Sequence, residues 1–99
     1  MESSAVISQD VLARYAADAA REVAGVRRLV ESHVPYRRAV RLEGDEGALR
    51  VELHIAVDWG ASIPDVGRAV QKRVREYLLR MAGVEPVAVD VVVDEIAGR

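Results

Sequence analysis

The sequence predicts a two-layer α+β domain, in which a mainly antiparallel sheet of three or more strands carries two helices on one face. Three features lead to this prediction: one strand with strict alternation, two segments with apolar residues at helical spacing, and a valine-rich C-terminal segment. At 99 residues, the chain has room for a single domain spanning 1–99. We expect residues 1–4 and 97–99 to fray.

The first helix is expected from Gln9 to Val23. Ser8 is a suitable N-cap, and Gly25 lies where a glycine would end the helix. The apolar residues that recur at three- and four-residue steps are Val11, Leu12, Tyr15, Ala16, Ala19, Ala20 and Val23.

Two apolar segments leave alternatives open. Residues 5–7 form a candidate leading strand, which would change the order of elements from αββαβ to βαββαβ and make a ferredoxin-like arrangement the alternative topology. Residues 26–35 fit either an extra helical turn or a short extended segment, and Pro35 marks a break in the pattern.

A β-hairpin is the clearest unit of the sequence. Its strands are expected over 38–43 and 48–59, joined by a turn over 44–47 that contains two glycines. In the second strand, apolar side chains occupy the odd positions Leu49, Val51, Leu53, Ile55, Val57 and Trp59. Mostly polar side chains fill the even positions, so one sheet face should be buried and the other wet. Trp59 is then expected in the core or at its edge.

The second helix is expected from its N-cap, Ser62, to about Ala82, and Gly83 ends it. Its core stripe consists of Ile63, Val66, Val70, Val74, Tyr77, Leu78 and Met81. The final strand is expected over 87–96, with a valine at every odd position on one face. Its other face carries Ala88, Asp90, Val92 and Asp94.

The composition excludes several classes of protein. Because there is no cysteine, the chain has no disulfide framework, thiolate metal site or cysteine nucleophile, which fits a reducing compartment. No secretory signal is visible, and no run approaches the roughly 18 apolar residues that a membrane span needs. A formal net charge of −2 gives no whole-domain signal for nucleic acid. We therefore expect a cytoplasmic protein without a direct membrane span.

Catalytic and cofactor motifs are missing from the sequence, which has no phosphate-binding glycine loop, dinucleotide motif or helical zinc motif. His54 is the one candidate for metal binding or proton transfer, with Glu52 and Asp58 nearby in sequence. Asp90 or Asp94 could join it from the last strand. Since zinc sites normally need three or four ligands, we favour a solvated strand face. The sequence therefore predicts no enzyme activity, no cofactor and no metal site.

Two surfaces are candidates for contact with a partner. On the second helix, one stripe on the side away from the core consists of Arg68, Lys72 and Arg75. This stripe is either an ordinary solvated face, a surface for a protein partner or a second copy, or a surface for nucleic acid. On the last strand, a sheet face that is not fully polar consists of Ala88, Asp90 and Val92.

Several segments, in their shared order, resemble the alkaline-shock protein family. The central one is VDWGASIPDV, from Val57 to Val66, which continues through the Val70-Gln71 pair. The flanking segments are the helix end at 81–84, the valine-rich strand at 87–93 and the segment 22–26 after the first helix. Together they extend over most of the chain.

The resemblance implies a bacterial cytoplasmic protein with no known enzymatic activity, linked to cell-envelope stress. Members of that family associate with the membrane through an integral membrane partner and can self-assemble. We therefore expect a non-enzymatic interaction or scaffold protein near the membrane, whose partner is a second copy or a small integral membrane anchor protein. The alternative is a small RNA- or DNA-binding module that uses the basic second helix. It is less favoured, because a GxxG clamp and exposed aromatic side chains on the sheet are missing.

Overall fold

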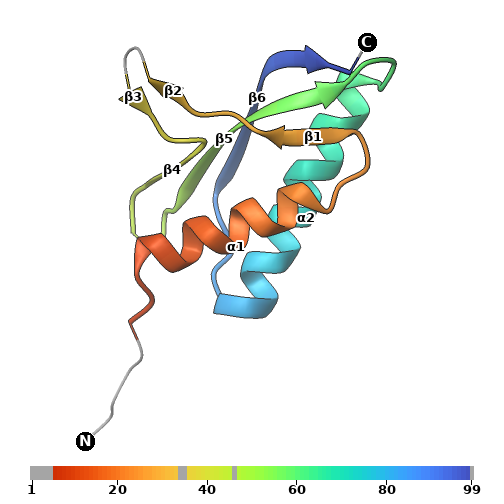
Figure 1. Ribbon diagram of the computed structural model, residues 1–99. Coiled ribbons are helices and arrows are strands. Elements are labelled where there is room, and N and C mark those ends of the chain that lie inside the picture. Colours follow the sequence, from red (N-terminus) through yellow and green to blue (C-terminus); the bar gives the residue numbers. More distant parts are fainter. Residues whose placement is uncertain (1–5, 34–35, 46, 99) are drawn as a thin grey trace, which may run out of the picture.

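The computed structural model describes residues 6–33, 36–45 and 47–98 (Figure 1). In these ranges the elements are α1 (Gln9–Arg21), β1 (Val26–Leu29), β2 (Ser32–His33), β3 (Tyr36–Arg37), β4 (Val40–Glu43), β5 (Arg50–Asp58), α2 (Ile63–Ala82) and β6 (Ala88–Ala97). β1, β4, β5 and β6 form the main sheet, and β2 and β3 form a separate two-stranded unit. The predicted α+β class with a mainly antiparallel sheet is confirmed.

β5 is the centre of the main sheet. Along one edge it pairs in parallel with β6, from Arg50 opposite Ala88 to Asp58 opposite Ala97. Along the other edge it pairs antiparallel with two strands in succession, β1 beside its C-terminal half and β4 beside its N-terminal half. β1 and β4 are therefore two halves of one edge, and β6 forms the opposite edge.

The chain leaves the sheet between β1 and β4 and then returns. On one side of this interruption the Val30 N–H donates to the His54 carbonyl at 2.8 Å, and on the other the His54 N–H donates to the Ala39 carbonyl at 2.8 Å. Between these two bonds, β2 and β3 pair antiparallel and form an arm that projects from the sheet in Figure 1. His54 thus marks the base of the arm.

Both helices cover the same face of the sheet (Figure 1). α1 contacts β1 and β4, whereas α2 contacts β6. The helices also pack on each other, with the rings of Tyr15 and Tyr77 edge to face at 5.8 Å between centroids. Arg73 Nη1 of α2 lies 2.8 Å from Glu22 Oε2, just after α1. The expected two layers are confirmed.

The core lies between the sheet and the helices. The odd-numbered side chains from Leu49 to Val57 are at most 1% exposed, as their alternation predicts. Helix residues that cover them include Leu12, Ala16, Ala19, Ala20, Val70, Val74 and Leu78. The alanines of α1 have small side chains, so this helix packs close to the sheet.

The hairpin and α2 lie close to their predicted positions. The strands of the hairpin begin two residues later than expected, its turn starts at Gly44 with φ 86°, and residue 46 of that turn lies outside the described residues. The Ser62 hydroxyl accepts the Asp65 N–H at 3.4 Å, and Gly83 ends α2 in the left-handed conformation at φ 67°.

Several boundaries differ from expectation. Residues 6–7 are not in a strand, and residues 1–5 lie outside the described part of the chain. α1 ends at Arg21, because the chain turns there to bury Val23 before it enters β1. We expected Ala97 to fray, but β6 continues through it. The reason is that the Ala97 carbonyl accepts a hydrogen bond from the Trp59 N–H at 2.7 Å.

The burial pattern also departs from expectation at the ends of the elements. Ile63 and Met81, which we expected in the core stripe of the second helix, are instead exposed, and so are Trp59 and Val87. Each of the four lies at or next to the end of a helix or strand. Conversely, the outer face of β5 is not uniformly exposed to solvent, since His54 is only 5% exposed and Ala56 is fully buried.

Candidate interaction site

A buried polar network lies on the outer face of the sheet, at the base of the arm. His54 Nε2 is 2.8 Å from Glu52 Oε2, and His54 Nδ1 is 2.9 Å from Asp94 Oδ2. The His54 side chain is 6% exposed. Both ring nitrogens therefore lie within hydrogen-bond distance of a carboxylate oxygen. The expectation of a solvated strand face is therefore wrong at His54.

Asp94 of β6 lies on the same outer face as this histidine. Val92 pairs with His54, and Asp94 follows two residues later, so strand alternation places its side chain on that face. The register shifts between Val93 and Glu95, which leaves Asp94 as the extra residue of a β-bulge. Of the two aspartates that could have joined His54 from the last strand, the structure brings this one to it. Asp90 Oδ2 instead lies 3.7 Å from Arg50 Nη2 of β5.

Two arginines extend the network on either side of the histidine. Arg37 Nη2, from β3, donates to Asp94 Oδ2 at 2.7 Å, and Arg41 Nη1 lies 3.6 Å from Glu52 Oε2. The hydrogen bond from His54 lowers the pKa of Glu52; burial opposes this, and the positive charges of His54, Arg41 and Arg37 add to it. The network therefore ties the arm to both β5 and β6.

The ring nitrogens of His54 are already occupied within the network. Within the described ranges, no three His, Cys, Asp or Glu side chains could hold a metal ion together. Both nitrogens of His54 are engaged by carboxylates, so neither is free to bind a metal or to accept a proton from a substrate. What the arrangement does is hold the arm against the sheet.

The two predicted contact surfaces border the same edge of the sheet. Gln71 Nε2 of α2 donates to the Val89 carbonyl of β6 at 3.0 Å, which places this side of the helix along β6. Arg68 and Arg75 lie three and four residues from Gln71 and share its side of the helix. Lys72 lies farther round the helix, where it lines a hollow with Val23 and Ala24 after α1. We call the combined surface the β6 margin, and its residues are Arg68, Lys72, Arg75, Ala88, Asp90 and Val92.

Only part of the β6 margin is free to meet a partner. Arg68 Nη2 donates to Asp65 Oδ1 at 2.5 Å. Lys72 is exposed and Arg75 is half-buried, and neither makes an ion pair with any described residue. On the strand, Val92 is 36% exposed. Of the three cations in the predicted stripe, only Lys72 and Arg75 are therefore unpaired among the described residues.

Exposed apolar side chains continue the β6 margin toward the C-terminal end of the strand. Ile96 is 54% exposed and Trp59 is 57% exposed, and with Ile63 they line a hollow of about 280 Å³. Of the two positions expected for Trp59, in the core or at its edge, the structure shows the edge, directly after the last residue of β5. Neither described helix is long and apolar enough to cross a membrane.

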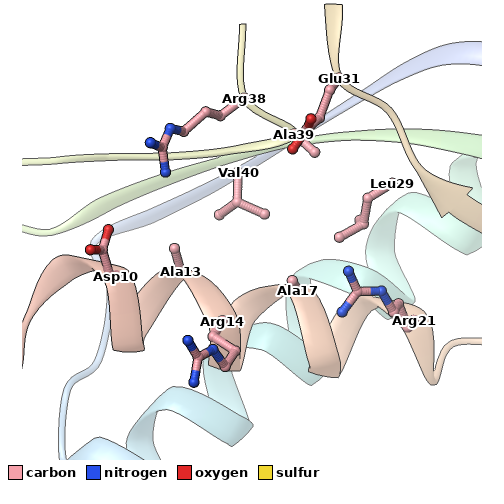
Figure 2. Close-up of a pocket in the computed structure, with 10 residues that line it drawn as sticks. All are labelled: Asp10, Ala13, Arg14, Ala17, Arg21, Leu29, Glu31, Arg38, Ala39 and Val40. Atoms are coloured by element: carbon pink, nitrogen blue, oxygen red, sulfur yellow. The ribbon is translucent and has the colours of Figure 1, made fainter.

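A groove opens between α1 and the interrupted edge of the sheet, with a volume of about 580 Å³ (Figure 2). Figure 2 shows Ala13 and Ala17 of α1 pointing toward Val40 of β4 and Leu29 of β1, which together form an apolar floor. The rim is charged, and its residues are Asp10, Arg14, Arg21, Glu31 and Arg38. The groove follows from the interruption, because the chain leaves the sheet there.

A second hollow of about 280 Å³ extends the groove along β4. It shares four lining residues with the first, and it adds Gln9, Arg41 and Leu42. Sequence reasoning did not point to this groove, because nothing in the pattern of 26–35 showed that the chain would leave and re-enter one sheet edge. The only local signal was the pair of breaks around Pro35 and Gly44.

Comparisons with known proteins give a family and a fold. The model of the alkaline shock protein 23 family, described by a cell envelope-related function, matches residues 1–97. Among solved structures, one MamM-CTD variant is 14% identical with a TM-score of 0.60, covering 92% of this chain and all of that one. The manganese form of another MamM CTD variant is 15% identical with a TM-score of 0.58, over 89% of this chain and 99% of that one. At such identities the likeness shows the fold alone. No curated protein matches the chain.

Proposed function

The chain belongs to the alkaline shock protein 23 family, which has a cell envelope-related function. We propose that, in this function, the chain is a non-enzymatic interaction module. In this proposal it works in the cytoplasm close to the membrane, either by self-association or by contact with a membrane-anchored protein. The family resemblance supports the location and the kinds of partner. The structure supplies the surface.

The β6 margin is the observation that carries this proposal. β6 is a ten-residue edge strand, and no strand in the described part of the chain pairs with its outer side. The unpaired main-chain groups of such an edge can accept a strand from another chain. Exposed Val92 and Ile96 add apolar contact area, and Lys72 adds a free charge. These are features of a contact surface.

The polar groups of the chain support contact better than catalysis. A general acid or base must reach the substrate, but His54 is buried with both nitrogens bonded to carboxylates. Most of the described arginines are also committed to ion pairs with the chain's own carboxylates. Little reactive chemistry is left for a substrate.

Charge reversal on the helix side of the margin tests the proposal. We expect Arg68→Glu with Lys72→Glu to weaken self-association, followed by sedimentation velocity across a concentration series, or recruitment of a partner in pull-down. The fold should remain, because both side chains are exposed, and circular dichroism checks this. Arg80→Glu is the matched control, since it reverses an exposed positive charge on the same helix outside the predicted stripe. Unchanged sedimentation together with unchanged pull-down would contradict the proposal.

The ion pairs of α2 reduce the positive charge that this helix could offer to nucleic acid. Arg68 is paired with Asp65 and Arg73 with Glu22, and the α2 cations that remain are Lys72, Arg75 and Arg80. Filter binding at two salt concentrations separates the two functions, because contacts to several phosphates give a steep loss of affinity with salt. Salt-sensitive binding that Lys72→Glu abolishes would favour nucleic acid over a protein partner.

A further inference from the structure

We infer that the groove between α1 and the interrupted β1–β4 edge binds an extended, acidic peptide segment of a partner protein. This inference rests on the proposed interaction function, and it adds a second contact surface with a defined class of partner. The groove lies along the sheet edge opposite to β6. A partner could therefore occupy it while the β6 margin is engaged.

The shape of the groove suits a segment of chain. The two hollows of about 580 and 280 Å³ share lining residues and run along α1. Their floor is apolar and made of small or branched side chains, among them Ala13, Ala17, Leu29 and Val40. Every second side chain of an extended peptide would point into this floor, and the others would reach the charged rim.

The main chain of β4 offers hydrogen bonds along the same groove. Because the Ala39 carbonyl faces β5, the alternation of an antiparallel ladder directs the N–H and C=O groups of Val40 and Leu42 to the opposite side. No described strand pairs with that side. The side chains of these two residues pack toward the core, so the edge itself stays accessible. An extended peptide can add to such an edge.

The rim charges select for acidic residues in a peptide. Arg14 and Arg38 make no ion pair with any described residue, although most other described arginines do, and both lie on this rim. Arg21 and Arg41 also line the groove, each already paired with a carboxylate of the chain. The rim also carries two carboxylates, which would repel a continuous layer of anionic lipid headgroups. A peptide can place its carboxylates selectively at the arginines, so the observations favour a peptide over a membrane.

The inference is tested with the full chain and a capped synthetic peptide of alternating glutamate and valine. Binding is followed by amide chemical shifts in a ¹⁵N-labelled protein and by fluorescence anisotropy of the labelled peptide. We expect shifts to concentrate at Ala13, Ala17 and Val40. Arg14→Glu and Arg38→Glu should each weaken binding about five-fold, and together about 25-fold if the two sites act independently. Ala13→Leu should also weaken binding by filling the floor.

Three controls decide the outcome. The matched variant is Arg80→Glu, because Arg80 is also an exposed helix arginine without an ion pair among the described residues; its binding should stay unchanged. The matched peptides replace glutamate by lysine, or carry N-methyl groups that block strand addition, and both should bind weakly. Vesicles of phosphatidylglycerol test the lipid alternative. Absence of binding by the acidic peptide at low salt would overturn the inference, and so would an equal effect of Arg80→Glu or a preference for the vesicles.

This test is separate from that of the β6 margin. If the peptide fails to bind while Lys72→Glu still weakens assembly, the groove inference fails and the proposed function stands. If Lys72→Glu has no effect and the peptide binds in the groove, the chain has a different interaction surface from the one proposed.

Discussion

Replacing His54 with alanine is expected to lower the free energy of unfolding by about 3 kcal/mol. The side chain is 6% exposed and makes two hydrogen bonds to carboxylates, at 2.8 and 2.9 Å. A hydrogen bond to a charged group contributes roughly 1.5–3 kcal/mol. The loss should fall toward the lower end of the sum, because Glu52 and Asp94 are 36% and 25% exposed and keep Arg41 and Arg37 as partners.

The pH dependence of this effect has a defined sign. The pKa of Glu52 is lowered in the folded state from its ordinary value of 4.5, mainly by the hydrogen bond from His54. A lowered carboxyl pKa stabilises the fold fully above the unfolded pKa, and that contribution disappears as the pH falls through the folded pKa. The difference between the wild type and His54→Ala should therefore be complete at neutral pH and become smaller in acid.

Urea unfolding followed by circular dichroism, at neutral pH and below the ordinary pKa of Glu52, measures both quantities. His33→Ala is the matched control, since His33 is the other histidine and is exposed on the arm; it should change stability by less than about 0.5 kcal/mol. A loss for His54→Ala as small as that of the control would refute the reasoning. A loss that stays constant in acid would show that Glu52 does not contribute.

Three further substitutions test the turn after α1, the interior of α2 and the N-cap of α2. Gly25→Ala should cost about 2 kcal/mol or more, because Gly25 has φ 97° and a Cβ would lie 2.6 Å from Val66 Cγ2. Gly67→Ala should instead stabilise by about 0.5–1 kcal/mol, since it is in α2 and an added Cβ would meet nothing within 4 Å. Ser62→Ala should cost about 1 kcal/mol by removing the N-cap of α2. Thermal unfolding measures all three, and a Gly25→Ala protein as stable as Gly67→Ala would contradict the expected clash.

The sequence by itself determined the elements whose signals are local. The odd positions of β5 alternate strictly with polar ones, and alternation reports which sheet face is buried. α2 has a serine cap at one end and Gly83 at the other, so both of its limits could be placed. The absence of cysteine and of phosphate-binding loops likewise follows from residue types alone. None of these inferences needs to know which strand lies beside which.

Only the tertiary structure decided the features that depend on register. Asp94, and not Asp90, reaches His54, and Asp94 is the residue that a β-bulge leaves without a partner on β5. The division of one edge into β1 and β4, which opens the groove, depends on both strands pairing with β5. Trp59 continues the alternation of the core, yet it is 57% exposed just beyond the last residue of β5. Such pairings join residues far apart in the chain, where periodicity carries no information.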